Sequence, residues 1–176
     1  NIGFPSPRIR ALILRLRYFF PAVVMVCSAP ALAGITIHFQ GSVKDSASIE
    51  KIAKAACAEA EKNRWRCHRL FGDEIERLDL VSVKMLLEIN PSKDISRARG
   101  VVVYIHELAD PLYLVFGPSL KTSNYIKTQF AGAEVHIRVI ELLEKISPFF
   151  IALGARDEGE YWETRDRAKL EKALSD

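Results

Sequence analysis

Two apolar runs in the middle of the chain constrain its fold more than any other feature. Residues 100–106 and 112–116 are dominated by Val, Leu, Ile, Tyr and Phe, a composition typical of β-strands. The link of five residues between them predicts an antiparallel pair. Because both runs are apolar at successive positions, we expect this pair to lie at the centre of a sheet that is covered on both faces.

Periodic apolar residues predict further elements on both sides of this pair. Residues 35–40 alternate as in a half-buried strand, a second strand is expected to start near Trp65, and residues 151–163 are expected to form a last strand. Helices are expected between residues 45 and 63 and between residues 132 and 148, because the apolar residues there recur at the spacing of one buried stripe. A short helix is expected at the C-terminus.

This order, βαβββαβα, predicts an α+β domain with a mainly antiparallel sheet and helices packed on one face, a sandwich of ferredoxin-like kind. Residues 71–90 match neither the helical nor the strand period and stay unassigned. The chain has 176 residues, of which 49% are hydrophobic and 27% are charged, so it is long and apolar enough for a single core. We therefore expect residues 34–176 to form one domain.

The first 33 residues have the pattern of a secretory signal peptide. Four arginines are followed by an apolar run and by Ala31-Leu32-Ala33, a small-residue cleavage pattern. The run is shorter than the roughly 20 residues that a membrane span needs, so we expect a periplasmic or secreted protein with no stable span in the mature domain. The alternative is that residues 1–33 are a mis-called N-terminal extension, in which case the protein is cytoplasmic.

The charge of the expected domain argues against a nucleic-acid partner. The whole chain carries a formal net charge of +3, but four of its 25 basic residues lie within the first 33 residues, which contain no Asp, Glu or Lys. Without that segment the charge becomes −1. A nucleic-acid-binding domain would show a basic excess, and none is left.

Two cysteines, Cys57 and Cys67, lie within the expected domain, on either side of the turn that ends the first helix. At ~1.5 Å per helical residue and ~3.3 Å per strand residue, Cys57 lies ~9 Å from the turn along the helix and Cys67 lies ~13 Å from it along the strand. The two side chains can therefore meet. A disulfide between them persists only in an oxidising compartment. The alternative is two buried thiols that act as small apolar groups. No cysteine or histidine spacing is typical of a structural zinc site.

Histidines and carboxylates that could do chemistry occur in two places, the turn between the two apolar runs and the last third of the chain. His136 belongs to the first turn of the second long helix, where the helix dipole disfavours its protonation. If they converged on one pocket, these groups could bind a divalent cation or transfer protons. No cofactor is predicted beyond that alternative. The candidate site residues are His106, Asp110, His136, Asp157, Glu158 and Glu160.

The acidic run near the C-terminus also suggests a role without catalysis. If the run is extended, Glu158, Glu160 and Trp162 share one face, which suits a protein partner with a basic surface. The chain has no phosphate loop and no serine-hydrolase or metalloprotease motif. We therefore favour a binding module, in the manner of an immunity or inhibitor protein. The alternative is a small metal-assisted hydrolase that uses His106, His136 and the carboxylates of 157–160.

Several sequence motifs of this chain resemble those of a family of small bacterial proteins that has no established function. They are GITIH (34–38), KTQFAG (127–132), EVHI (134–137), ELL (141–143) and DEGEYWET (157–164). Members of the family carry a Pro-His-Pro…Glu-Pro-Leu element, where this chain has Ile105-His106-Glu107 and Asp110-Pro111-Leu112 without the two flanking prolines. The resemblance covers residues 34–174 and implies a fold but no activity. Family members begin near the residue that matches Gly34, which strengthens the alternative that residues 1–33 are a mis-called N-terminal extension.

Overall fold

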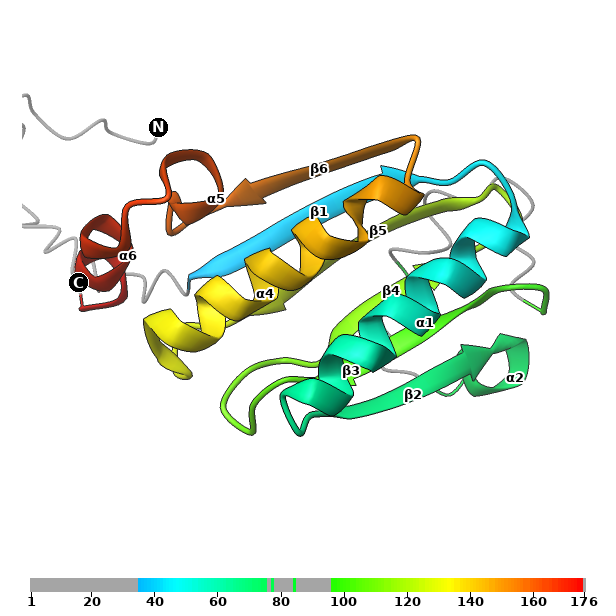
Figure 1. Ribbon diagram of the computed structural model, residues 1–176, viewed down its shortest axis with the longest axis horizontal. Helices are drawn as coiled ribbons and strands as arrows, with labels where there is room; N and C mark the ends of the chain where they lie inside the picture. The colour runs from blue at the N-terminus through cyan, green and yellow to red at the C-terminus, as the bar shows by residue number, and fades with distance from the viewer. Residues whose placement is uncertain (1–34, 76, 78–83, 85–95, 176) are drawn as a thin grey trace, which may run out of the picture. The chain divides into compact units, whose positions relative to one another are not determined.

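In the computed structural model, residues 35–75, 77, 84 and 96–175 are described, and they form six strands and five α-helices (Figure 1). The strands are β1 (Thr36–Ser42), β2 (Arg66–Phe71), β3 (Arg99–Tyr104), β4 (Leu112–Phe116), β5 (Lys121–Lys127) and β6 (Ala152–Asp157). The helices are α1 (Ser46–Lys62), α2 (Gly72–Ile75), α4 (Gly132–Ile146), α5 (Tyr161–Thr164) and α6 (Arg167–Ser175), with a 3-10 helix η1 (Ser147–Phe149) after α4. The predicted leader and most of the unassigned segment 71–90 lie outside the described residues.

The strands form two antiparallel sheets of three strands each. Sheet A has the order β5-β1-β6, and sheet B has the order β2-β3-β4. The predicted hairpin is confirmed, because β3 pairs with β4 in a register that sets Val101 opposite Leu114. The central strand β3 is buried from Gly100 to Val103, as its continuous apolar run predicted. The two sheets meet where β4 and β5 lie side by side, joined by a tight turn in which the Leu120 N–H donates to the Gly117 carbonyl.

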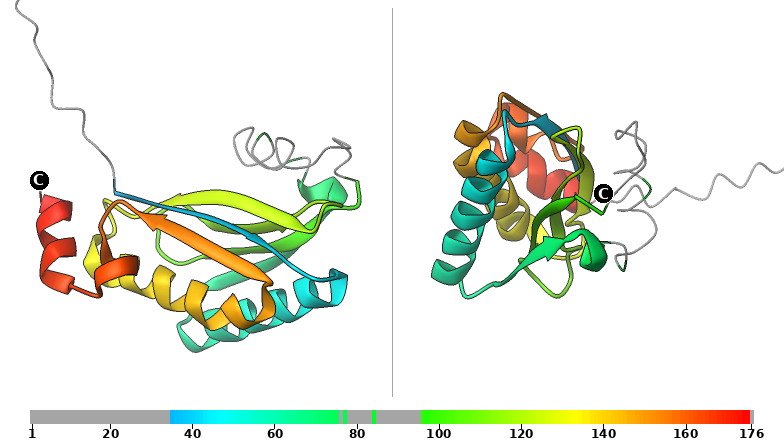
Figure 2. Two further views of the ribbon diagram at one scale, coloured as in Figure 1. Left: turned by 90° about the horizontal axis from the view of Figure 1, so that it is seen from above. Right: turned by 90° about the vertical axis from the view of Figure 1, so that its right-hand side faces the viewer.

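Helices α1 and α4 cover one face of the strands (Figure 1; Figure 2, right). Helix α4 buries Val139, Leu142, Leu143 and Ile146 of the stripe that its spacing predicted, whereas Val135, the first residue of that stripe, is half-buried. Helix α1 begins at a cap in which the Asp45 side chain accepts a hydrogen bond from the Ser48 N–H. The apolar side chains of both helices and the inward residues of the strands form one core. The predicted α+β sandwich with helices on one face is therefore confirmed.

Strand β5 was not predicted, although it forms one side of sheet A. Its buried positions are Thr122, Asn124 and Ile126, so two of the three inward residues are polar. Hydrophobic periodicity reports a strand only when the inward residues are apolar. The strand is held instead by its pairing with β1, in which Ile126 lies opposite Ile37.

The prediction of an extended acidic run was wrong. Strand β6 ends at Asp157, the next residues turn, and Trp162 belongs to helix α5. The Asp157 carboxylate causes the change of direction, because it accepts hydrogen bonds from the N–H groups of Gly159 (2.7 Å) and Trp162 (2.9 Å). Glu158, Glu160 and Trp162 therefore do not share a strand face.

A disulfide joins α1 to β2. It links Cys57 to Cys67, whose Cα atoms are 5.4 Å apart. Between the two cysteines the chain leaves the helix, turns and enters the first residues of sheet B. The bond therefore ties the C-terminal half of α1 to the edge strand of that sheet.

Candidate functional site

Two of the predicted site residues, His136 and Asp157, meet in the interior. The side chains of both have 0% of their surface exposed. His136 comes from the first half of α4, and its Nε2 lies 3.0 Å from the carboxylate oxygens of Asp157 at the end of β6. On the other side of the ring, Nδ1 lies 2.7 Å from the hydroxyl of Thr128, which is also fully buried. We call these three residues the buried triad.

Every polar group of the buried triad has a partner. In the neutral tautomer that satisfies both contacts, Nε2–H of His136 donates to Asp157, and the Thr128 hydroxyl donates to Nδ1. The Asp157 carboxylate also accepts the two backbone N–H groups that start the turn into α5. The triad thus connects the residue after β5 with α4, β6 and α5. Thr128 was missed by the sequence reasoning, because a single threonine between a polar strand and a helix carries no periodic signal.

The hydrogen bonds of Asp157 outweigh its burial. Burial raises the pKa of its carboxyl, but the hydrogen bonds from the His136 ring and from the Trp162 and Gly159 N–H groups hold that pKa below its ordinary value. The ionised carboxylate is therefore the form that the fold stabilises.

This depressed pKa predicts a loss of stability in acid. A group with a lower pKa in the folded state stabilises the protein fully above its unfolded pKa, about 3.9 for Asp, and loses that contribution as the pH falls through the folded pKa. We therefore expect the difference in unfolding free energy between the wild type and Asp157→Asn to shrink below about pH 4. Urea titrations at several pH values measure it, with the exposed Glu163→Gln as control. A difference that stays constant down to about pH 2 would contradict a role for the carboxylate charge.

The buried triad combines the same types of group as a nucleophilic catalyst, namely a hydroxyl, an imidazole and a carboxylate. A substrate has no access to it, however, because all three side chains are buried. The space beside the pair is also filled. A Cβ atom added at Gly159 would lie 2.5 Å from Leu170 Cδ1, 3.3 Å from Asp157 Oδ1 and 3.4 Å from His136 Cε1. The triad therefore has a structural role: it holds the residue after β5, helix α4, the end of β6 and helix α5 together.

The other predicted pair, His106 and Asp110, stabilises the turn between β3 and β4. His106 Nδ1 accepts the Leu108 N–H at 3.1 Å. The Asp110 N–H donates to the Lys127 carbonyl at 3.0 Å, and its carboxylate accepts the Lys127 N–H at 3.3 Å. Within the described parts of the chain, no group of three or more His, Cys, Asp or Glu side chains is placed to hold a metal ion. His106, His136 and the carboxylates of 157–160 thus form no metal site there.

The carboxylates of the expected partner surface are engaged by the chain itself. Glu158 accepts the Thr36 N–H at 3.1 Å and lies 3.4 Å from Nε2 of His38 and 3.9 Å from Nη2 of Arg156. Glu160 lies 3.4 Å from Lys169, and the Arg165 guanidinium lies 5.6 Å from the Trp162 ring. Cations of the chain itself therefore balance much of the charge of this run.

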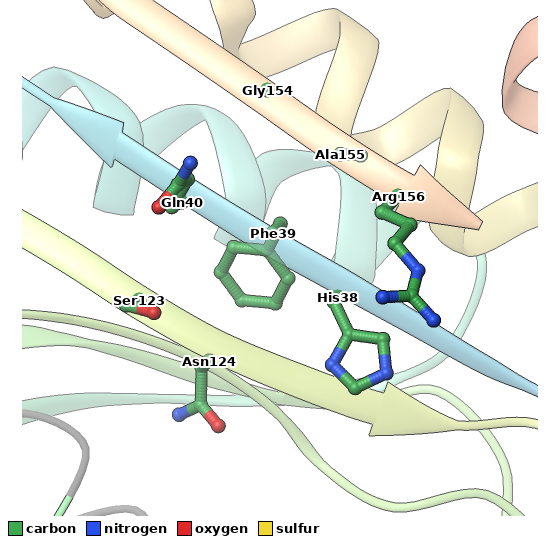
Figure 3. Close-up of a pocket in the computed structure, with 8 residues that line it drawn as sticks. All are labelled: His38, Phe39, Gln40, Ser123, Asn124, Gly154, Ala155 and Arg156. Carbon is green, nitrogen blue, oxygen red and sulfur yellow. The ribbon is translucent and has the colours of Figure 1, made fainter.

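An open groove crosses the face of sheet A that α1 and α4 do not cover. It consists of a hollow of 250 Å³ at the His38 end and a hollow of 610 Å³ at the Ser42 end, which share Gln40, Ser123 and Gly154. In Figure 3 the helices lie behind the strands, and the side chains of the register partners His38 and Arg156 lie next to each other. We call this feature the sheet A groove. The residues that we use to define it are His38, Gln40, Ser42, Lys121, Ser123, Gly154 and Arg156.

Comparison with known proteins adds no constraint. No protein-family model, curated protein or solved structure matches the chain. Over the described residues, no helix combines the length and the apolar character that crossing a bilayer requires. The function is therefore inferred from the site itself.

Proposed function

We propose that residues 34–176 are a non-catalytic binding domain that holds a segment of a partner protein in the sheet A groove. The observation that carries this proposal is the contrast in access between the two candidate sites. The histidine and carboxylate best suited to proton transfer are sealed in the buried triad, whereas the hydrogen-bonding side chains of the groove face solvent. A domain of this kind offers a surface for recognition and no accessible group of the triad for chemistry.

The dimensions and chemistry of the sheet A groove suit an extended peptide. From His38 to Ser42 it follows β1 for four residue steps, or about 13 Å at ~3.3 Å per residue. Its middle is lined by Gln40, Ser123 and Gly154, which offer hydrogen bonds and leave room for another chain. Lys121 lies at one end and Arg156 at the other, opposite Ser42 and His38 respectively.

Lys121, together with the part of the Arg156 charge that Glu158 leaves unbalanced, favours a partner segment with polar or acidic side chains. The contact surface that we propose therefore differs from the Glu158, Glu160 and Trp162 surface expected from the sequence, whose carboxylates are already paired. Glu158 contributes at the Arg156 end, where its exposed part borders His38.

We also propose that the domain is exported, in the manner of a periplasmic or secreted immunity or inhibitor protein. The Cys57–Cys67 bond supports export, because disulfides form and persist mainly in oxidising compartments. The small size of the chain and the near-neutral charge of residues 34–176 suit a protein that acts by occupying a partner surface.

Filling the groove is expected to abolish partner binding without harming the fold. A Cβ atom at Gly154 would have nothing within 4 Å, so the backbone there accepts a side chain, and Gly154→Tyr adds a ring to the middle of the groove. Tagged wild type and variant are exposed to an envelope extract of the source organism, and retained proteins are identified by mass spectrometry. We expect a partner that the wild type retains to be lost by Gly154→Tyr.

The matched control is Ala58→Tyr, which adds the same ring at an exposed position of α1. Helix α1 lies on the opposite face of the strands from the groove (Figure 1). Ala58→Tyr should retain the partner as well as the wild type does. Equal retention by all three proteins would show that the sheet A groove is not the contact surface. Unchanged melting temperatures for both variants exclude unfolding as the cause of a loss.

A further inference from the structure

A second groove lies where the end of α1, the start of β2 and the β3–β4 turn meet. It encloses 570 Å³, which falls within the range of about 300–1,000 Å³ typical of small-molecule sites. We call it the arginine groove. The polar and aromatic side chains that line it are Arg64, Trp65, Arg66, Tyr104, His106 and Glu107.

Arg64 occupies a backbone position that favours glycine. Helix α1 ends in a Schellman turn, in which the Arg64 N–H donates to the Glu61 carbonyl (3.1 Å) and the Trp65 N–H donates to the Ala60 carbonyl (2.8 Å). This geometry gives Arg64 a φ of 60°, in the left-handed region. Among the described residues, no carboxylate pairs with its side chain. Arginine is therefore an unfavourable residue for this turn, and Arg64 is one of the residues that line the groove.

Two further groups in the arginine groove can donate hydrogen bonds to a ligand. The guanidinium of Arg66 lies over the ring of Tyr104, 4.6 Å from its centroid, and within the described part of the chain it has no carboxylate partner. Nδ1 of His106 accepts the Leu108 N–H, so in the neutral ring the proton resides on Nε2, which can donate. Glu107 is the opposing charge among the lining residues.

We infer that the arginine groove binds a small anion, a carboxylate or a phosphate, attached to a flat apolar ring. Guanidinium groups present a planar fork of donors that matches the oxygens of both anions. The exposed parts of Trp65 and of the Arg66–Tyr104 stack offer flat surfaces for the ring. This inference rests on residues outside the sheet A groove, so it stands or fails independently of the proposed function.

Benzoate and phenyl phosphate are suitable probes, with benzamide as the uncharged control. Each is titrated into the full-length, oxidised protein, while NMR follows the indole N–H of Trp65 and the Nε–H groups of Arg64 and Arg66. We expect saturable shifts with at least one anion and none with benzamide. Tighter binding of phenyl phosphate would identify a phosphate ligand, and tighter binding of benzoate would identify a carboxylate. Absence of saturation with both anions, or equal shifts with benzamide, would overturn the inference.

Arg64→Gly separates a binding role from a structural one. Loss of a charge-assisted hydrogen bond should weaken anion binding by about tenfold or more. Because glycine relieves the left-handed strain, the melting temperature should rise by about 3 °C at the same time. A variant that is more stable and binds less cannot be explained by misfolding.

Two charge variants complete the test. Glu107→Gln removes the opposing carboxylate and should tighten binding of the anion. Arg69→Gln removes another arginine of β2, the strand that contains Arg66. Arg69 is paired with Glu50 and does not line the groove, so this change should leave anion binding unchanged. If Arg64→Gly and Arg69→Gln weakened anion binding equally, the net charge of the protein would explain the effect, and the proposed site would be overturned.

Discussion

Asp157→Asn is expected to lower the free energy of unfolding at neutral pH by about 3 kcal/mol, among the largest effects of any single change in this chain. The carboxylate accepts the His136 ring N–H and two backbone N–H groups in a site closed to water. An amide of the same shape has one acceptor oxygen, and its NH2 group must face one of those three donors. The variant therefore loses charge-assisted bonds and leaves a buried donor unsatisfied.

Thr128→Val should cost less, about 1 kcal/mol, because it removes one neutral hydrogen bond and keeps the side-chain shape. Urea denaturation of the purified proteins measures both effects. Glu158→Gln, next in the chain but partly exposed, is the control and should differ little from the wild type. If Asp157→Asn proved as stable as the wild type, the buried triad would not hold these elements together, and a chemical role for it would have to be reconsidered.

Removing the disulfide is expected to have the second large effect. The Cys57–Cys67 bond closes a loop across a sequence separation of 10 residues, and the loss of loop entropy in the unfolded chain predicts a stabilisation of about 3 kcal/mol. The double variant Cys57→Ser, Cys67→Ser should therefore unfold at a clearly lower urea concentration than the oxidised wild type. The reduced wild type should match the double variant.

Intact mass by cell fraction checks the same bond in its natural setting. The exported protein should be about 2 Da lighter without reductant, as one disulfide requires. If reduced and oxidised wild type unfolded at the same urea concentration, or if the isolated protein carried two free thiols, the disulfide and the argument for export would both be contradicted.

The parts of the fold that hydrophobic periodicity controls could be predicted from the sequence. The inward residues of the β3–β4 hairpin and of α1 are apolar, and so are those of α4 apart from His136, so their spacing is visible in the sequence. Strand β5 could not be predicted in this way, because Thr122 and Asn124 occupy inward positions that are normally apolar. The acidic run was misassigned, because the hydrogen bonds of Asp157 to the following backbone bend the chain and leave no trace in the apolar pattern.

Only part of the buried triad could be predicted, because its contacts also leave no pattern in the sequence. His136 and Asp157 were chosen by residue type, but their contact depends on how α4 returns along sheet A, across a separation of 21 residues. The sheet A groove could not be predicted, since it combines the outward faces of β1, β5 and β6. Gly154 and Ser123 matter there for the space that they leave, which a single sequence does not report.

The most direct test of the central claim, that the sheet A groove is the contact surface of a binding domain, is site-specific photo-crosslinking in cells. A benzophenone amino acid replaces Gln40, which lies in both hollows of the groove, or Ala58 on the exposed side of α1. We predict that illumination joins one defined partner protein to the Gln40 derivative and not to the Ala58 derivative. A partner captured equally from both positions, or captured from Ala58 alone, would contradict the proposed function.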